Sequence, residues 1–312
     1  SPQQANGTSY DATVVAVVIF EGFAGMWINA FIVSMTCMAW IKKKTLNSNE
    51  KILLLLACSR VWYLCISCLY YFLSVFYPYY LYVHSALSLV VTIHTSLNCL
   101  NVWVSACLCV FYCIKIANFR NSFFIYLKVK IDRIVPWLLL GSLLFSLLIG
   151  ILVYNFTENA LCKNINFTCQ GRIWKSNLRM DEHFFPIYFT NGFGFVSSFA
   201  TVIFSALLLL FSLWRHKRNM QTNSMKDLSM EAHIKAMKSI LSFLVMYSIN
   251  FIILILTLTY ADWKQNLMMF LIYEFLGAFP SVHSLVLICS NPKLEKSMLR
   301  ILFSVKSKVC MK

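Results

Sequence analysis

Residues 134–154 read IVPWLLLGSLLFSLLIGILVY and contain no charged side chain. A helix needs about 20 predominantly apolar residues to cross the hydrocarbon core of a bilayer, so this stretch is long enough to span a membrane. Six more runs share its length and apolar character, and they are Ala12–Trp40, Ile52–Phe76, Ser85–Cys113, Phe184–Trp214, Ile234–Tyr260 and Leu267–Ser290. The sequence therefore predicts an all-α membrane protein, a bundle of seven transmembrane helices.

Lysine and arginine fall mainly into every second gap between these runs. They follow the first, third and fifth runs, in residues 42–51, 115–133 and 215–238, and they recur from Lys293 onward. Cytoplasmic loops of membrane proteins collect Lys and Arg, so this pattern predicts the N-terminus outside and the C-terminus inside. The net charge of +15 would then form an inner rim that attracts anionic lipid rather than a surface for nucleic acid.

The predicted outer loops carry features of their own. Glycosylation sequons begin at Asn6, Asn155 and Asn166, all on the outer side of this topology, which supports the same orientation. Of the twelve cysteines, only Cys162 and Cys169 fall in an oxidising loop. These two either bridge to each other or remain free thiols, because the geometry of a disulfide cannot be read from sequence.

The loops are too short to form further domains. We expect residues 1–11 to be a short extracellular N-terminus, residues 12–292 to be the seven-transmembrane domain, and residues 293–312 to be a cytoplasmic tail. Within the tail, Leu294–Val305 has the pattern of an amphipathic helix that lies along the membrane surface.

Three polar side chains are predicted at matched depths inside the membrane. At about 1.5 Å of rise per residue, Arg60 lies roughly 13 Å from the inner end of the second run, and Asn29 and Ser281 lie at about 15–16 Å in the first and seventh. An arginine in lipid must satisfy five donors. We therefore expect Arg60 to join Asn29 and the region of Ser281, with snorkelling toward the headgroups as the alternative.

A second polar layer is predicted nearer the outer face. Asn98 and Glu274 both lie at about 25 Å from the inner face, and His94 lies one turn above Asn98 on the same helix face. With aromatic residues of similar depth, the expected ligand-binding set is His94, Asn98, Glu274, Tyr71, Phe193 and Tyr273. Aromatic walls with few convergent polar groups describe a small-molecule pocket. The alternative is that Asn98 and Glu274 only bridge helices.

The predicted inner helix ends carry a third set of polar residues, which is Tyr112, Lys115, His216, Lys217 and His233. The histidines have no Cys or carboxylate at metal-ligand spacing, so we expect no metal site and no cofactor. Common catalytic motifs are absent from the sequence, and we therefore expect that the protein is not an enzyme.

Short motifs on five of the runs resemble those of the type 2, or bitter, taste receptors, which are G-protein-coupled receptors. They are LACSR at 56–60, FYCIKIANF at 111–119, LFSLWRH at 210–216, HI at 233–234 with FLVMY at 243–247, and PSVHS at 280–284 with NPKL at 291–294. Each motif alone is weak, but their common order on the expected helices is specific. His94 is a departure, because members often carry Trp there.

The resemblance implies a receptor in the plasma membrane that binds small bitter agonists in the outer pocket. It also implies that the inner-end residues contact a heterotrimeric G protein of the gustducin or inhibitory class. Whether the receptor forms oligomers stays open. The competing hypotheses are a polytopic transporter, for which we find neither paired repeats nor broken helices, and a membrane-embedded enzyme.

Overall fold

The computed structural model describes residues 2–77, 80, 86–117, 119, 121–167, 185–220, 241–242, 244–253, 255–256 and 267–310. Within these ranges the side chains of 2–14, 160–167, 185–191, 213, 216–220, 267–274, 276 and 305–310 are not described. The helices are α1 (Pro2–Lys43), α2 (Ser48–Phe76), α4 (Ala86–Ile116), α5 (Ser122–Phe167), α6 (Phe185–Met220), α8 (Leu267–Ser290) and α9 (Pro292–Cys310).

The apolar helices match the seven predicted runs. Among the described residues, five segments are long and apolar enough to span a membrane, and these are Val15–Lys43, Ser48–Phe76, Ala86–Ile116, Ser122–Asn159 and Gly192–Ser212. Two shorter apolar segments, Leu244–Ile253 and Gly277–Ser290, lie in the sixth and seventh runs. The predicted all-α, seven-helix membrane fold is confirmed, while its orientation in the membrane stays a prediction.

Two helices extend well beyond their apolar runs. α1 begins at Pro2 instead of Ala12, and α5 continues to Phe167 instead of ending near Tyr154. A helix does not have to end where the lipid ends, because its backbone hydrogen bonds remain internal in water. As a result, Asn155 lies exposed on a helix and not in the loop that the apolar pattern predicted.

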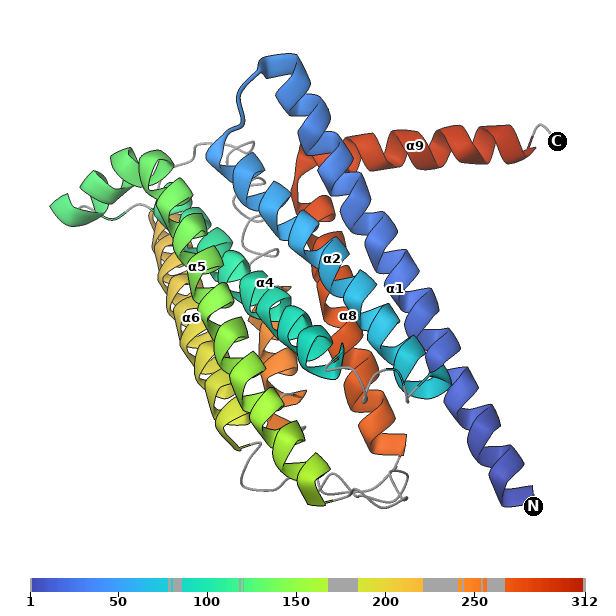
Figure 1. The fold of residues 1–312 in the computed structure, drawn as a ribbon. Coiled ribbons are helices and arrows are strands. Elements are labelled where there is room, and N and C mark those ends of the chain that lie inside the picture. The colour runs from blue at the N-terminus through green and yellow to red at the C-terminus, as the bar shows by residue number, and fades with distance from the viewer. Residues whose placement is uncertain are drawn as a thin grey trace.

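α4 lies at the centre of the bundle (Figure 1). It packs against α2, α5 and α6, while α1 packs against α2 and α8. Leu100, Val104, Leu108 and Phe111 recur at helical spacing on α4 and are buried in one core cluster with residues of α2 and α5. This spacing places them on one face, which is why α4 can serve as the common neighbour.

The turn between α1 and α2 is short and locally specified. Lys44 adopts a left-handed conformation with φ 57°, and its N–H donates to the carbonyl of Trp40 at 2.7 Å. The N–H of Asn47 donates to Oε2 of Glu50 at 3.0 Å, which satisfies a donor at the start of α2. Glu50 also pairs with Lys43 at 3.1 Å. These contacts fix α1 and α2 as an antiparallel pair.

Glycines permit close approaches between helices. A Cβ added at Gly25 of α1 would overlap the Ser281 hydroxyl of α8, and one added at Gly150 of α5 would overlap the Ser96 hydroxyl of α4. At Gly141 of α5 a Cβ would meet no atom of the described residues within 4 Å. Small residues let helix backbones approach in a membrane. Gly25 therefore sets the spacing of α1 and α8, and Gly150 that of α4 and α5.

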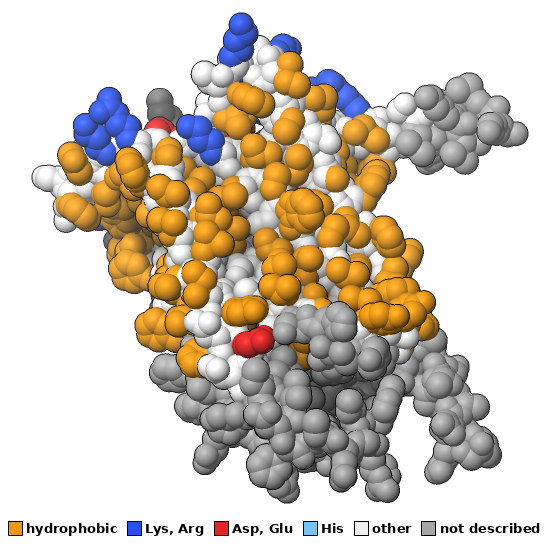
Figure 2. All heavy atoms as spheres, in the orientation of Figure 1, with side chains coloured by type: hydrophobic (Ala, Val, Ile, Leu, Met, Phe, Trp, Pro, Cys, Tyr) orange, Lys and Arg blue, Asp and Glu red, His pale blue; other side chains and the backbone are white. Residues whose placement is uncertain are grey.

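The surface separates apolar from charged side chains. Figure 2 shows hydrophobic side chains over the middle of the molecule and Lys and Arg gathered at one end, near the α1–α2 turn and the start of α5. The exposed aromatic residues include Trp27, Trp62 and Trp137. We call the charged end the basic end, and it is defined by Lys42, Lys43, Lys44, Lys51, Lys128 and Lys130. This distribution suits a protein whose sides face lipid.

α9 leaves the bundle at the basic end and runs across the direction of α1 and α8 (Figure 1). Leu294 is buried and Met298 packs on the core cluster, which anchors the start of α9. Farther along, Leu299, Leu302 and Phe303 are exposed. A helix with an exposed apolar stripe and basic residues beside it suits the boundary between lipid and water.

Candidate functional site

The guanidinium of Arg60 is the centre of a buried polar cluster, and this residue is 1% exposed. Its Nη1 donates to Oγ of Ser284 at 2.7 Å, and its Nη2 donates to Oγ of Ser105 at 3.3 Å. Nη2 also contacts Nδ1 of His283. If Nδ1 is the acceptor, His283 is neutral with its proton on Nε2. The cluster therefore joins α2 to α4 and α8.

Asn29 enters the same cluster through Ser284. The Ser284 hydroxyl lies 2.7 Å from Oδ1 of Asn29 and 2.8 Å from the carbonyl of Pro280, and it donates to them. Nδ2 of Asn29 donates to the carbonyl of Gly25 at 2.8 Å. Arg60 and Asn29 are thus brought together, as expected, but by a different serine from the one that the depth estimate selected.

Ser281 takes no part in that hydrogen-bonding path. Among the described residues its buried hydroxyl has no hydrogen-bond partner, and it lies against Gly25. Ser284 follows it by three residues, which is almost one helical turn toward the basic end. A depth estimated from the rise per residue along two helices is not accurate to one turn. This explains why the estimate selected the hydroxyl of Ser281 and not that of Ser284.

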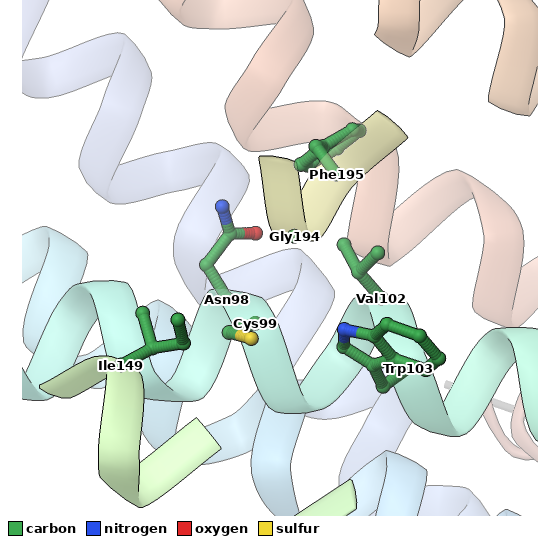
Figure 3. Close-up of a pocket in the computed structure, with 7 residues that line it drawn as sticks. All are labelled: Asn98, Cys99, Val102, Trp103, Ile149, Gly194 and Phe195. Carbon is green, nitrogen blue, oxygen red and sulfur yellow. The ribbon is translucent and has the colours of Figure 1, made fainter. Parts of the chain in front are cut away.

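A small cavity lies between α4, α5 and α6 (Figure 3). It is lined by Asn98, Cys99, Val102, Trp103, Ile149, Gly194 and Phe195. Figure 3 shows the Asn98 carboxamide extending from α4 toward the α6 backbone at Gly194. The ring of Trp103 packs edge-on against Phe145 of α5, with centroids 5.4 Å apart. A volume of about 10 Å³ holds one water molecule and is far too small for an agonist.

Three other residues of the expected pocket lie elsewhere. Nε2 of His94 is 3.1 Å from Oγ of Ser67, so the imidazole faces α2 and not this cavity. Tyr71 lies on α2 beside Tyr70, with ring centroids 5.6 Å apart. Phe193 is 64% exposed, and the α6 residues that line the cavity are its successors.

These differences arise because the depth estimate ignores the direction in which each side chain points around its helix axis. Depth along a helix places a residue at a level in the membrane, but successive residues are rotated by about 100° around the axis. Phe193 and Phe195 share a level and face different neighbours. The side chains of Glu274 and Tyr273 lie outside the described residues.

Glu21 is an intramembrane acid that the sequence reasoning did not select. It is half-buried on α1, and a Cβ at Gly277 of α8 would lie 3.6 Å from its Oε2. Gly277 follows Glu274 by about one turn of α8. The signal that could have identified Glu21 is its charge inside an apolar run, since such residues are costly in a membrane.

Tyr247 is a second residue to which the sequence reasoning gave no role. It is fully buried, at 0% exposure, and its hydroxyl donates to the carbonyl of Val102 at 3.3 Å. Its ring lies parallel to that of Phe199, at 8° and with centroids 6.0 Å apart, and it meets Phe279 edge-on at 5.7 Å. One side chain of the sixth apolar run therefore contacts α4, α6 and α8.

At the basic end, two of the expected inner-end residues have specific partners. The hydroxyl of Tyr112 donates to Oδ1 of Asn49 at 3.2 Å, which joins α4 to the start of α2. Nζ of Lys115 pairs with Oδ2 of Asp132 at 2.7 Å, which joins α4 to α5. The side chains of His216 and Lys217 lie outside the described residues.

The remaining expected sites also fall outside the described part of the chain. His233 and Cys169 are not described, and neither are the side chains of Asn6, Cys162 and Asn166. Among the described residues, no group of three His, Cys, Asp or Glu side chains could hold a metal ion.

A family model described as Taste receptor protein (TAS2R) matches residues 8–306. The chain belongs to the type 2 taste receptor family. Taste receptor type 2 member 7 of Macaca mulatta is 33% identical over 305 residues, covering 95% of this chain and 94% of the relative. Taste receptor type 2 member 9 of Homo sapiens is 31% identical over 308 residues, covering 96% of each. Taste receptor type 2 member 64 of Pan paniscus is 33% identical over 294 residues, covering 93% of each.

Membership of the type 2 taste receptor family confirms the resemblance drawn from the sequence motifs. The protein is a multi-pass membrane receptor of the bitter taste class and not an enzyme. In general terms, the family implies a small-molecule ligand and coupling to a G protein. The match spans nearly the whole chain, so the seven helices and the polar cluster both lie within it, and the transporter hypothesis gains no support.

Proposed function

We propose that agonists of this bitter taste receptor bind in the half of the bundle away from the basic end, with Asn98 as a polar anchor. The observation that carries the proposal is the cavity lined by Asn98, Trp103 and Phe195. Within the described part of the chain, no hydrogen bond involves the Asn98 carboxamide, so its donors and acceptor are available to a ligand. Glu274 is proposed as the second polar contact, and Tyr273 as part of the wall.

Agonist binding at this site requires the cavity to widen. A ligand shifts a conformational equilibrium only by its differential affinity for the two packings, so the agonist has to favour an arrangement in which α4 and α6 lie farther apart. α6 is loosely packed at Gly194, because the one described atom that a Cβ there would approach is Cε1 of Phe145, at 3.9 Å. Moving α6 away from α4 at this point therefore loses few contacts. His94 and Tyr71 then influence agonist binding indirectly. They affect the position of α4 from the side that faces α2, and they do not line the cavity described above.

The experiment is calcium imaging of cells that express the receptor with a promiscuous Gα subunit, screened against a panel of bitter compounds. For the agonists found, Asn98→Ala is expected to lower potency by about tenfold, the equivalent of one hydrogen bond of about 1.4 kcal/mol. Phe193→Ala is the matched control, because Phe193 is one residue from the cavity lining and exposed. Surface staining is measured in parallel.

Equal loss of response to all agonists together with falling surface expression would contradict the assignment, since it would mean that Asn98 only joins helices. A cationic agonist provides a further contrast. It should lose more potency than a neutral one on Glu274→Gln, because the variant removes a charge and leaves the size of the side chain unchanged.

For signalling, we propose that the basic end receives a heterotrimeric G protein of the gustducin or inhibitory class. The ends of α2, α4 and α5 are linked there by the Tyr112–Asn49 and Lys115–Asp132 contacts. Both side chains of the ion pair are exposed, so an acidic partner surface can compete for Lys115. His216, Lys217 and His233 are proposed as further contacts of the G protein.

We further propose that the basic end is cytoplasmic and that the receptor resides in the plasma membrane. Residues 1–11 are then extracellular, residues 12–292 form the membrane domain, and residues 293–312 form a cytoplasmic tail whose helix α9 contacts anionic lipid. Oligomers and a Cys162–Cys169 disulfide are compatible with this topology.

The orientation predicts glycosylation at Asn166. Glycosidase treatment of the expressed receptor should increase its mobility on a gel, and Asn166→Gln should reduce that change. Asn155→Gln is the comparison, because Asn155 lies close to the apolar part of α5, where the transferase has poor access. An unchanged shift in Asn166→Gln would place the sugar elsewhere, at Asn6 or Asn155.

A further inference from the structure

The indole of Trp103 carries a hydrogen-bond donor that the described packing does not use. Its Nε1 is buried and has no hydrogen-bond partner among the described residues. An indole N–H can donate a hydrogen bond but cannot accept one, so it needs an acceptor atom. A buried donor without an acceptor costs free energy, and such a group in a folded protein therefore calls for an explanation.

Trp103 borders the cavity between α4, α5 and α6. On α4 the lining residues are Asn98, Cys99, Val102 and Trp103, which lie on one side of the helix because they are one or four residues apart. Figure 3 shows the indole nitrogen at the end of the ring that is nearer to Cys99 and Asn98. Trp103 follows Asn98 by five residues, which is about 7.5 Å along α4 toward the basic end. The two residues therefore offer polar groups at two levels of one cavity.

The volume and the charge of the cavity restrict what this donor can bind. A volume of about 10 Å³ holds one water-sized group, and a carbonyl oxygen is such a group. None of the lining residues carries a charge, so an anion would be buried there without an opposite charge. A quaternary ammonium group has no lone pair with which to accept from the N–H. A neutral oxygen acceptor meets all of these conditions.

We propose that Trp103 selects agonists that carry a neutral hydrogen-bond acceptor, such as the carbonyl oxygen of a ketone or a lactone. This inference rests on the agonist site proposed above and names the class of ligand that the site takes. The N–H is enclosed in the described packing, so the oxygen reaches it only when the cavity widens, as agonist binding already requires. Because the bond forms only in the widened packing, it gives the agonist the differential affinity that shifts the equilibrium.

The test removes the N–H of Trp103 and keeps the shape of its ring. Suppression of an amber codon at position 103 introduces benzothienylalanine, in which a sulfur atom takes the place of the indole N–H. Calcium imaging then compares neutral carbonyl compounds, namely coumarins and cyclic ketones, with quaternary ammonium salts that have no carbonyl group. The carbonyl agonists should lose about tenfold in potency, the equivalent of one hydrogen bond, while the ammonium agonists keep theirs.

The same replacement at Trp62 is the matched control, because Trp62 is 64% exposed on α2 and is not a lining residue of the cavity. It should leave the potency of every agonist unchanged. Trp103→Phe is a second variant that lacks the N–H and keeps an aromatic ring beside Phe145, and it should show the same selective loss. Surface staining of each variant separates lost potency from lost expression.

The proposal is overturned if no carbonyl compound activates the wild type, or if carbonyl agonists keep their potency when the N–H is removed. It is also overturned if both classes of agonist lose potency equally, since Trp103 would then act through packing alone. Asn98→Ala separates this inference from the proposed agonist site. A loss of potency in Asn98→Ala without any effect at Trp103 would leave the agonist site in place and remove only the selectivity assigned to Trp103.

Discussion

Replacing Arg60 by alanine is expected to remove most of the receptor from the cell surface. The change empties a fully packed volume and leaves the hydroxyls of Ser284 and Ser105 without their donor. Loss of a large buried side chain and of its hydrogen bonds costs about 3–5 kcal/mol, which is a large share of the stability of a typical domain. Surface staining and thermal unfolding of the purified variant measure the effect.

Two further variants show which property of Arg60 matters. Arg60→Lys keeps the charge but loses the planar fork that reaches both serines, so it should recover only part of the surface level. Arg215→Ala is the control, because Arg215 is exposed at the basic end of α6, and it should reach the surface normally. A normal surface level and an unchanged dose response in Arg60→Ala would show that the polar cluster is not needed for folding or activation.

Gly25→Leu is expected to lower surface expression and melting temperature more than any other variant except Arg60→Ala. It places a branched side chain where a single Cβ already overlaps Ser281. α1 would have to move away from α8, and this would stretch the hydrogen bond between Ser284 and Asn29. Overpacking of a tight interface costs about 1–3 kcal/mol. The expected readouts are reduced surface expression and a lower melting temperature.

Gly141→Leu is a closely matched control, since a Cβ at Gly141 would contact none of the residues that the structure describes within 4 Å. It carries the same substitution in another membrane helix and should leave both measurements unchanged. Equal losses in the two variants would mean that glycine matters for helix insertion in general and not for contact between α1 and α8.

The seven helices could be predicted because the length of an apolar run depends on the membrane alone. The same reasoning could not give the ends of α1 and α5, since a helix that emerges into water no longer shows an apolar pattern. The family could also be identified from the sequence, because its motifs occur in order on five runs. The orientation remains a prediction from the positions of Lys and Arg.

The depth of the polar cluster in the membrane could be predicted from the sequence, but its hydrogen-bond partners could not. Matched depths selected Arg60 and Asn29, which the structure joins, and selected Ser281 where Ser284 makes the contact. Asn101 joins α4 to α2, because its Oδ1 accepts a hydrogen bond from Ser59 at 2.5 Å. This contact could have been suspected from the sequence, since Asn101 is an amide inside an apolar run. Phe193 and Phe195 show the remaining difficulty, because rotation about a helix axis depends on packing that one sequence does not contain.

The contacts of Tyr247 bear on how the bundle can move. On its α6 side the ring lies flat against Phe199, which in turn lies at 8° to Phe251 with centroids 4.3 Å apart. Parallel ring faces keep much of their attraction when one slides over the other, since dispersion has little directional preference. Short hydrogen bonds such as those of Ser284 weaken steeply when they are lengthened or bent. Small sliding movements therefore weaken the ring contacts between residues 244–253 and α6 less than they weaken the hydrogen bonds that join α1, α2 and α8.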